Sequence, residues 1–296
     1  MIARRALGRT GLVTSVLGFG GNRLGEAPDR AEARATFERA LERGVNLIDL
    51  ADAYGHGETE RLVGAWTRGR RDGLILCSKV GTRPAWSVRL GRWIDPIRRL
   101  RRGAVPRGGS GGRPYPRSSF APRTIAAAVA GSLRRLGTDR LDVLYLHSPP
   151  PEVVADDAVL AALAHERDAG RVRFTGISFP GSATTGDVLA GIARPGVSIV
   201  QVRVSLASTV DVDRVAAAAA PADVAVVARE PFLKGRLLDT TDASTLLRAV
   251  AQRRGVDAIL VGTTRRDHLD ENLAALAAPP LGDAEMRELW SRATVL

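Results

Sequence analysis

Four side chains suited to acid–base chemistry stand at or just beyond the ends of short apolar runs. Asp49 closes one run, Tyr54 lies just after it, and Lys79 and His147 follow the next two runs along the chain. Taken alone, each has a commoner structural use: an aspartate as a helix cap, a tyrosine in packing, a histidine in the core or at the surface. Their joint placement is what indicates a site.

The four residue types suit the interconversion of a carbonyl and an alcohol. A carbonyl that accepts a hydride becomes an alkoxide and needs a proton, which a tyrosine can supply. A lysine ammonium beside the phenol lowers its pKa from about 10, and an aspartate keeps that lysine charged and in place. A histidine can hydrogen-bond the substrate oxygen and orient it. This chemistry requires no metal, and we predict no metal site.

The apolar runs alternate with amphipathic stretches, as expected for buried parallel strands that alternate with helices. Asp29 and Glu32 form a candidate capping box at one helix start, and Gly137 is a stop signal for another helix. The expected strands are 16–19, 47–49, 74–78, 141–146, 174–178, 199–202, 224–228 and 258–261. One expected helix begins near Asp29 and includes 33–41, and another includes 125–136. The others are expected at about 58–66, 157–168, 184–192, 210–219, 244–253 and 267–276.

This alternation predicts a single-domain α/β fold over residues 1–296, a (β/α)8 TIM barrel. Residues 2–14 are expected to form a β-hairpin that closes the barrel bottom, and about 283–293 an extra C-terminal helix. A doubly wound open sheet is the alternative, but no GxGxxG follows the first strand. In a barrel the carboxyl ends of neighbouring strands converge, so Asp49, Tyr54, Lys79 and His147 should share one pocket.

The composition bounds the remaining function classes. The 296 residues carry a formal charge of +11, but the arginines are spread along the chain and only Arg98–Arg102 with Arg107 is dense. Positive charge is the only feature that would favour nucleic-acid binding, and no nucleic-acid-binding motif accompanies it. We therefore expect no nucleic-acid partner. The single Cys77 is expected in the core. Without an apolar run that could span a bilayer or serve as a secretory signal, the chain is expected to be cytoplasmic.

The connection 81–122 interrupts the barrel rhythm and is rich in Gly, Pro, Arg and Ser. Because it follows a strand, it belongs to the face where barrel active sites are built. One interpretation is a substrate-covering lobe that carries Trp86 and Trp93. The other is a partly disordered basic insertion. For residues 110–112 the two interpretations are equally favoured.

Several phrases together resemble the aldo-keto reductases. They are LGRTG at 7–11, LGFGG at 17–21, DLADAYGHGE at 49–58, SKV at 78–80, SLRRLGTDRLD at 132–142 and LYLH at 144–147. The resemblance covers nearly the whole chain. It implies NAD(P)H-dependent carbonyl reduction or alcohol oxidation, with Tyr54 as general acid and base, Lys79 and Asp49 tuning it, and His147 orienting the substrate.

The resemblance also implies a cofactor site. Gly21 and Asn22 follow the first strand, and Ser178 and Gln201 are similar to the family's contacts with the nicotinamide amide. The chain departs from the family at two positions: Phe179 stands where an asparagine is frequent, and by spacing Val204 stands where a stacking tyrosine is frequent. Loss of that ring should weaken nicotinamide binding unless another aromatic, Phe179 or Phe232, takes its place.

The remaining cofactor segments are similar to the family's pyrophosphate and adenosine sites. The segment 231–237 resembles the pyrophosphate loop, and 261–272 resembles the adenosine site, where Thr264 and Asp267 also form a candidate capping box. Arg265 and Arg266 favour NADPH, with NADH possible, although family members that prefer NADPH often carry lysine at Gly262 and arginine at His268. The implied contacts are Pro231, Phe232, Lys234, Gly235, Gly262, Thr263, Arg265, His268, Glu271 and Asn272.

Three functions remain open at this point. The first is a reductase of an aldehyde, ketone or sugar-like carbonyl. The second is an NAD(P)⁺-dependent aldose or alcohol dehydrogenase. The third is a catalytically weak NADP(H)-binding sensor or regulatory subunit, as among the potassium-channel β subunits. The expected partner is a small-molecule carbonyl or alcohol. The sequence indicates neither the substrate nor the oligomeric state.

Overall fold

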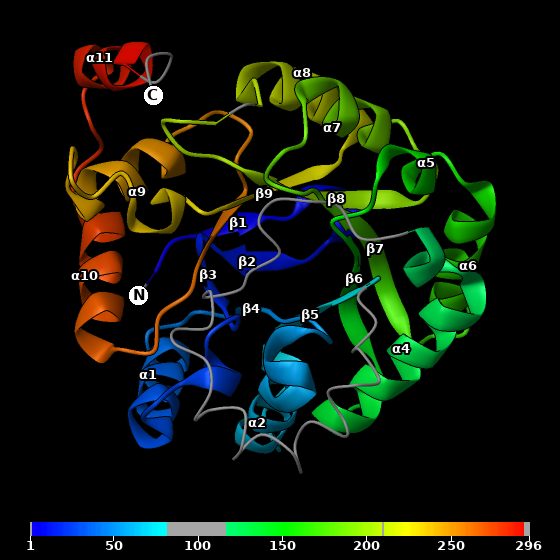
Figure 1. Cartoon of the computed structure of the whole chain (residues 1–296). Coiled ribbons are helices and arrows are strands. Elements are labelled where there is room, and N and C mark those ends of the chain that lie inside the picture. The colour runs from blue at the N-terminus through cyan, green and yellow to red at the C-terminus, as the bar shows by residue number, and fades with distance from the viewer. Residues whose placement is uncertain (1, 82–116, 209, 293–296) are drawn as a thin grey trace, which may run out of the picture.

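The computed structural model describes residues 2–81, 117–208 and 210–292. Eight parallel strands close into a barrel in the order β10-β3-β4-β5-β6-β7-β8-β9, and helices surround it (Figure 1). The predicted (β/α)8 barrel is therefore confirmed. The barrel strands are β3 Leu17–Gly20, β4 Leu47–Asp49, β5 Ile75–Val80, β6 Leu141–His147, β7 Val172–Ser178, β8 Val197–Arg203, β9 Ala225–Arg229 and β10 Ala258–Val261.

The helices follow the predicted amphipathic stretches. A short helix, α5, was not expected from the sequence. The helices are α1 Arg30–Glu42, α2 Glu58–Trp66, α4 Pro122–Leu136, α5 Pro151–Val154, α6 Asp157–Asp168, α7 Thr185–Ile192, α8 Val212–Ala222, α9 Ala243–Ala251, α10 Arg266–Ala277 and α11 Asp283–Arg292. Short 3₁₀ turns are η1 Gly8–Thr10, η2 Leu24–Glu26, η3 Tyr54–Gly57, η4 Arg71–Gly73, η5 Arg117–Phe120 and η6 Leu233–Gly235.

The two expected additions to the barrel are present. Strands β1 Arg4–Ala6 and β2 Val13–Ser15 pair antiparallel as the predicted hairpin. Its turn residues Leu7 and Leu12 are buried against the barrel interior. The extra helix α11 lies outside the ring beside α9 (Figure 1), where Trp290 packs near Leu246 and its ring faces the Arg253 guanidinium at 4.3 Å.

The barrel interior changes character along its axis. Strand side chains alternate between the interior and the helices, and the inward set near the middle includes Leu47, Cys77 and Tyr145. Cys77 is fully buried, as predicted for a core residue. At the carboxyl ends the buried side chains become polar or charged, namely Asp49, Lys79, His147 and Gln201.

Two helix signals from the sequence had different outcomes. Gly137 ends α4 in a left-handed conformation with φ of 66°, as predicted. Asp29 caps α1 by accepting from the Ala31 and Glu32 N–H groups. The expected return bond from Glu32 to the cap is replaced, because the Glu32 carboxylate instead contacts Arg266 at the start of α10.

The long connection begins and ends where the sequence indicated, since β5 ends at Val80 and α4 begins at Pro122. Its predicted substrate contacts Trp86 and Trp93, and the arginine-rich 98–107, lie outside the described residues. Within the part that is described, no helix is both long and apolar enough to cross a membrane.

Helix α2 packs tightly against the end of α4 at Gly64. A Cβ placed there would lie 2.4 Å from the Leu136 carbonyl oxygen, which is rigid backbone. We therefore predict that Gly64→Ala lowers the free energy of unfolding by about 1–3 kcal/mol through overpacking. Gly186→Ala is the matched control, because its Cβ meets only Thr184 Oγ1 at 3.6 Å. Urea unfolding should show the control unchanged or stabilised by up to about 1 kcal/mol. Equal stability of the two variants would contradict this packing argument.

Candidate active site

The four residues singled out in the sequence meet at the carboxyl ends of three neighbouring strands. Asp49 is the last residue of β4, Lys79 lies one residue before the end of β5, and His147 is the last residue of β6. Tyr54 begins η3, directly after β4. The parallel pairing of β4 with β5 and of β5 with β6 sets these side chains side by side.

The Lys79 ammonium is the centre of the cluster. Its Nζ atom lies 2.5 Å from Asp49 Oδ2, 2.7 Å from the Leu50 carbonyl oxygen and 3.1 Å from the Tyr54 hydroxyl. An ammonium has three N–H groups, so these contacts use all of them. Asp49 and Lys79 are both almost completely buried, at 4% and 2% exposure. The ammonium is therefore held at a fixed point beside the phenol.

The site shifts the pKa values of its members in ways that the geometry explains. Burial raises the pKa of the Tyr54 phenol, and the Lys79 charge opposes this shift without cancelling it. Burial alone would lower the pKa of Lys79, but the nearby Asp49 and Tyr54 outweigh it and the pKa is raised. At neutral pH the pair is thus a neutral phenol against a charged ammonium.

His147 is held in its neutral form. Burial, reinforced by the positive charges of Lys79 and Arg229, holds the pKa of His147 well below that of an exposed imidazole. Its ring meets the Tyr54 ring edge to face, with 5.9 Å between centroids. A neutral imidazole and a neutral phenol therefore lie side by side at this end of the barrel.

Gln201 joins the cluster from the other side of the barrel. Its Nε2 atom donates to Asp49 Oδ1 at 2.6 Å, so Asp49 accepts from Lys79 and Gln201 at once. The Gln201 Oε1 atom is buried and, within the described residues, has no hydrogen-bond partner. Ser178 is its neighbour across the β7–β8 pairing. The sequence pointed to Gln201 only as a cofactor contact and missed its contact with Asp49.

The two positions that depart from the family's nicotinamide pattern both face the core. Val204 is fully buried. Phe179 is 2% exposed and points at α7, where a Cβ on Gly191 would lie 2.5 Å from its ring. The expectation that Phe179 could supply a replacement ring is therefore wrong, because its ring fills the space that Gly191 leaves. Phe232 is half-buried against the core.

Arg229 occupies the carboxyl end of β9 and was missed by the sequence reasoning. Its guanidinium donates to the Phe179 carbonyl oxygen and pairs with Glu230, which also pairs with Arg203 at 3.2 Å. Its charge lowers the pKa of both Tyr54 and His147, as a minor cause in each case. A charged residue that directly follows an apolar strand was the available signal, the same one that identified Asp49.

The segment expected to bind pyrophosphate has an unusual backbone. Glu230, Leu233 and Lys234 adopt left-handed φ values of 55°, 48° and 59°, and Gly235 follows at 92°. Left-handed non-glycine residues are uncommon and cluster at ligand-binding loops. Lys234 is exposed and Pro231 is buried. The cation is therefore presented to solvent on a bent, ordered turn.

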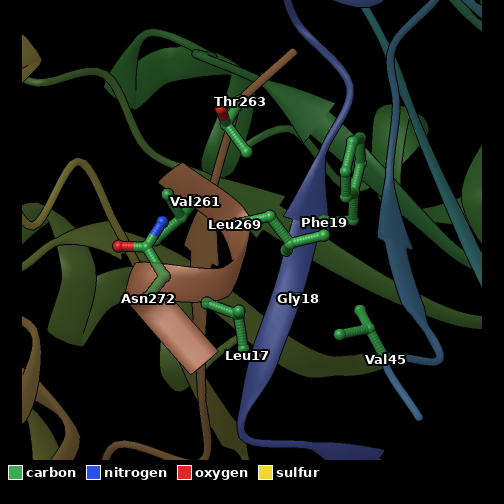
Figure 2. A pocket seen from close by; sticks show the side chains of 8 residues that line it. All are labelled: Leu17, Gly18, Phe19, Val45, Val261, Thr263, Leu269 and Asn272. Atoms are coloured by element: carbon green, nitrogen blue, oxygen red, sulfur yellow. The ribbon is translucent and has the colours of Figure 1, made fainter. Parts of the chain in front are cut away.

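The segment expected to bind adenosine surrounds the start of α10. Thr263 and Asn272 are largely buried and line a crevice against Leu17 and Phe19 (Figure 2). That crevice holds no cavity as large as a water molecule, so it is packing and not a ligand pocket. Figure 2 shows the Asn272 amide directed away from the apolar wall. Arg265, His268 and Glu271 are exposed at the rim.

The predicted capping box of Thr264 and Asp267 is wrong. The N-cap residue is Arg265 and no side chain of its own caps the helix. Glu32, which reaches over from α1, accepts the Arg266 N–H at 3.1 Å. A tertiary contact has therefore replaced the local cap.

Of the two residues expected after the first strand, Gly21 packs against the end of β4 and Asn22 lies close to this segment. The Gly21 N–H donates to the Asp49 carbonyl oxygen at 2.9 Å, and a Cβ on Gly21 would lie 2.6 Å from Leu50. Asn22 is exposed, and its Oδ1 atom would lie 2.6 Å from a Cβ on Gly262. Within the described residues, no group of three or more His, Cys, Asp or Glu side chains could hold a metal ion.

Comparison with known proteins shows the family to which the chain belongs. A family model described as the Aldo/keto reductase family matches residues 16–246, more than half of the chain. The chain belongs to the aldo/keto reductase family. The match includes all four clustered residues and the η6 turn, and ends before β10.

One curated relative is an oxidoreductase matched over part of its length. The oxidoreductase YqkF of Bacillus subtilis, itself named as uncharacterized, is 31% identical over 175 residues, which cover 59% of this chain and 48% of that protein. The chain thus spans about half the length of this curated relative in the match.

Two solved structures match almost end to end. Aldo-keto reductase AKR11C1 from Bacillus halodurans has a TM-score of 0.77 at 24% identity, covering 99% of this chain and 96% of that one. An aldo-keto reductase from Klebsiella pneumoniae in complex with NADPH has a TM-score of 0.74 at 23% identity, covering 98% and 94%. At these identities the likeness concerns the fold.

We predict that Lys79→Met destabilises the protein by about 3–5 kcal/mol, because it leaves the Asp49 carboxylate buried without its ion partner. The double variant Asp49→Asn with Lys79→Met should recover part of this loss in urea unfolding. Arg30→Met breaks the exposed pair with Glu58 and serves as the control, with an expected cost of about 0–1 kcal/mol. A double variant no more stable than Lys79→Met would argue against the uncompensated charge.

His147 predicts an acid-sensitive stability. Below the unfolded-state pKa of about 6.5 the unfolded chain takes up a proton at His147, whereas the folded chain, with its lowered pKa, does not. The free energy of unfolding should therefore decrease as the pH is lowered, by up to about 1.4 kcal/mol at pH 5.5 relative to a His147→Asn variant. Urea unfolding at pH 7.5 and 5.5 measures this difference. His165→Asn, at an exposed helical position, should retain the wild-type dependence. The idea fails if His147→Asn retains it too.

Proposed function

We propose that this chain is an NAD(P)H-dependent oxidoreductase that reduces an aldehyde, ketone or sugar-like carbonyl to an alcohol, with NADPH as cofactor and Tyr54 as general acid. The observation that carries the proposal is the 3.1 Å contact between the Lys79 ammonium and the Tyr54 hydroxyl, with Lys79 anchored by Asp49. The proposed enzyme is a single-domain cytoplasmic protein that acts on a small molecule, with neither nucleic acid nor membrane as a partner.

The residues present fit a nicotinamide dinucleotide. The buried Gln201 Oε1 atom lacks a partner within the described residues, and Ser178 lies next to it. An amide that offers both donor and acceptor groups would satisfy them. The left-handed turn at 233–235 with the exposed Lys234 suits a pyrophosphate. The solved Klebsiella pneumoniae relative with NADPH supports the choice of cofactor.

Each member of the cluster has a separate part in the proposed reaction. When bound, the cofactor supplies the hydride. Tyr54 donates its hydroxyl proton to the oxygen that gains charge as the carbonyl is reduced. The phenolate that remains is stabilised by the Lys79 ammonium, so the proton transfer does not create an unpaired buried charge. Asp49 keeps Lys79 charged and fixes its Nζ atom beside the phenol.

His147 orients the substrate in this mechanism. Because its pKa is held well below the ordinary value, the imidazole is neutral at physiological pH and offers one N–H donor. A donor of this kind fixes the carbonyl oxygen toward Tyr54 without competing as the proton source.

The raised pKa of Tyr54 bears on direction. The phenol stays protonated at neutral pH, which suits reduction, whereas alcohol oxidation requires the phenolate and should gain rate as the pH rises. The same geometry therefore supports an aldose or alcohol dehydrogenase as the second candidate. The third candidate is a sensor subunit, which would be favoured if the protein binds the dinucleotide but turns over no substrate.

We predict that Tyr54→Phe lowers kcat for carbonyl reduction by about 10²–10⁴-fold, since it removes the general acid. Loss of NADPH absorbance with a panel of aldehydes, ketones and sugars measures the rate, and the panel should be run in both directions. Tyr145→Phe is the matched control, because Tyr145 lies in the barrel interior beneath the cluster.

Two results would count against this function. Turnover unchanged in Tyr54→Phe would remove Tyr54 as the acid. Dinucleotide binding with no turnover on any substrate, in the wild type, would replace the reductase by the sensor reading.

A further inference from the structure

The two arginine side chains at the start of α10 already form ion pairs with carboxylates. Arg265 Nε donates to Asp267 Oδ1 at 3.0 Å, and its Nη2 atom pairs with the other oxygen of the same carboxylate. The Arg266 Nε atom lies 3.2 Å from a Glu32 oxygen. These arginines are the two that favour a 2′-phosphate in the sequence, and both are paired within the chain.

Two of the first three N–H groups of the helix also bind carboxylates. Glu32 accepts from the Arg266 N–H at 3.1 Å, and Asp267 accepts from the His268 N–H at 2.8 Å. Free N–H groups at a helix start are what would otherwise attract a phosphate. The hydrogen bonds from Arg265 and then from the His268 N–H lower the pKa of Asp267 to about 2, so the carboxylate stays charged over the working pH range.

The neighbouring positions do not add a spare cation. Gly262 stands where many family members that prefer NADPH carry lysine. A side chain there would meet Asn22 Oδ1 at 2.6 Å and the Gly20 carbonyl oxygen at 3.0 Å. A side chain at this position would therefore have to displace the Asn22 side chain, and the glycine itself supplies no cation. A 2′-phosphate must therefore displace a carboxylate from an arginine or lie against it.

A ribose hydroxyl meets the same surroundings differently. A hydroxyl can donate a hydrogen bond to Asp267 or Glu32, whereas a phosphate carries about −1.5 to −2 charges and is repelled by them. In dinucleotide-binding folds an acidic residue near the ribose is the usual means of accepting the unphosphorylated form. The local charge therefore reduces the advantage that Arg265 and Arg266 would give to a phosphate.

We propose that Asp267 and Glu32 are specificity residues that compete with a 2′-phosphate for Arg265 and Arg266, so that this chain binds NADH about as well as NADPH. The proposal rests on the proposed dinucleotide function of the same site. The Arg265–Asp267 pair is largely exposed, at 61% and 53% of its side chains, and in the Arg266–Glu32 pair the exposures are 59% and 31%. Exposed pairs are worth little, so the competition is a matter of several-fold and not of orders of magnitude.

The experiment compares dissociation constants for NADPH and NADH by fluorescence titration of the full chain. In the wild type the two should agree within about threefold. Asp267→Asn should tighten NADPH binding by about fivefold and leave NADH within about twofold, because the amide keeps the cap on His268 but no longer holds Arg265 as an ion pair. Adding Glu32→Gln should widen the difference further.

Asp270→Asn is the matched control. Asp270 lies on the same helix and pairs with Arg39 at 3.2 Å, so the variant changes the net charge equally without releasing Arg265 or Arg266. Its NADPH-to-NADH ratio should equal that of the wild type. An equal response of Asp267→Asn and Asp270→Asn would overturn the proposal, since net charge alone would then explain the change.

The outcomes separate this proposal from the function on which it rests. Wild-type binding of NADPH more than about threefold tighter than NADH would overturn the proposal, because Arg265 and Arg266 would then keep their advantage for a phosphate despite the carboxylates, and it would leave the reductase intact. Failure of the wild type to bind either dinucleotide would overturn the proposed function and this proposal together.

Discussion

The whole site depends on one buried ammonium. Lys79 is placed inside the barrel by β5 and would be costly there alone, because a desolvated charge needs a partner. Asp49 and the Leu50 carbonyl supply that partnership, and the third N–H of the ammonium is left to Tyr54. The ion pair with Asp49 offsets the cost of burying Lys79, and the same ion pair fixes the Lys79 Nζ atom beside the Tyr54 hydroxyl. Stability and chemistry are coupled through a single nitrogen atom.

That coupling extends across the barrel through Asp49. One carboxylate oxygen faces Lys79 and the other faces Gln201, which is 152 positions further along the chain. Asp49 therefore connects the four clustered residues, which come from β4 to β6 and η3, to β8 on the opposite side of the barrel. Arg229 adds a second, electrostatic link, because its charge reaches both Tyr54 and His147 from β9.

Local patterns were sufficient to predict most of the fold. Buried parallel strands are short and apolar, and turns or polar residues bound them, so 47–49 and 258–261 matched their strands residue for residue. The clustering of Asp49, Tyr54, Lys79 and His147 followed from the same reading, since parallel strands bring their carboxyl ends together. What the sequence missed depends on contacts between distant segments. Glu32 from α1, not Thr264, accepts a hydrogen bond at the start of α10, and the Phe179 ring packs against Gly191 of α7. Residues from other helices determined both outcomes.

The closure of β10 onto β3 has a consequence for the order in which the molecule becomes functional. β4 to β6 lie in the first half of the chain, whereas β10 and the start of α10 lie near its end. Synthesis proceeds from the N-terminus, so Asp49, Tyr54, Lys79 and His147 leave the ribosome long before the last strand does. Until that strand closes the seam, Asn22 has no Gly262 beside it and Glu32 has no Arg266 to hold. A nascent chain would carry Tyr54, its proposed proton donor, before the β3–β10 seam beside the proposed nucleotide-binding residues could form.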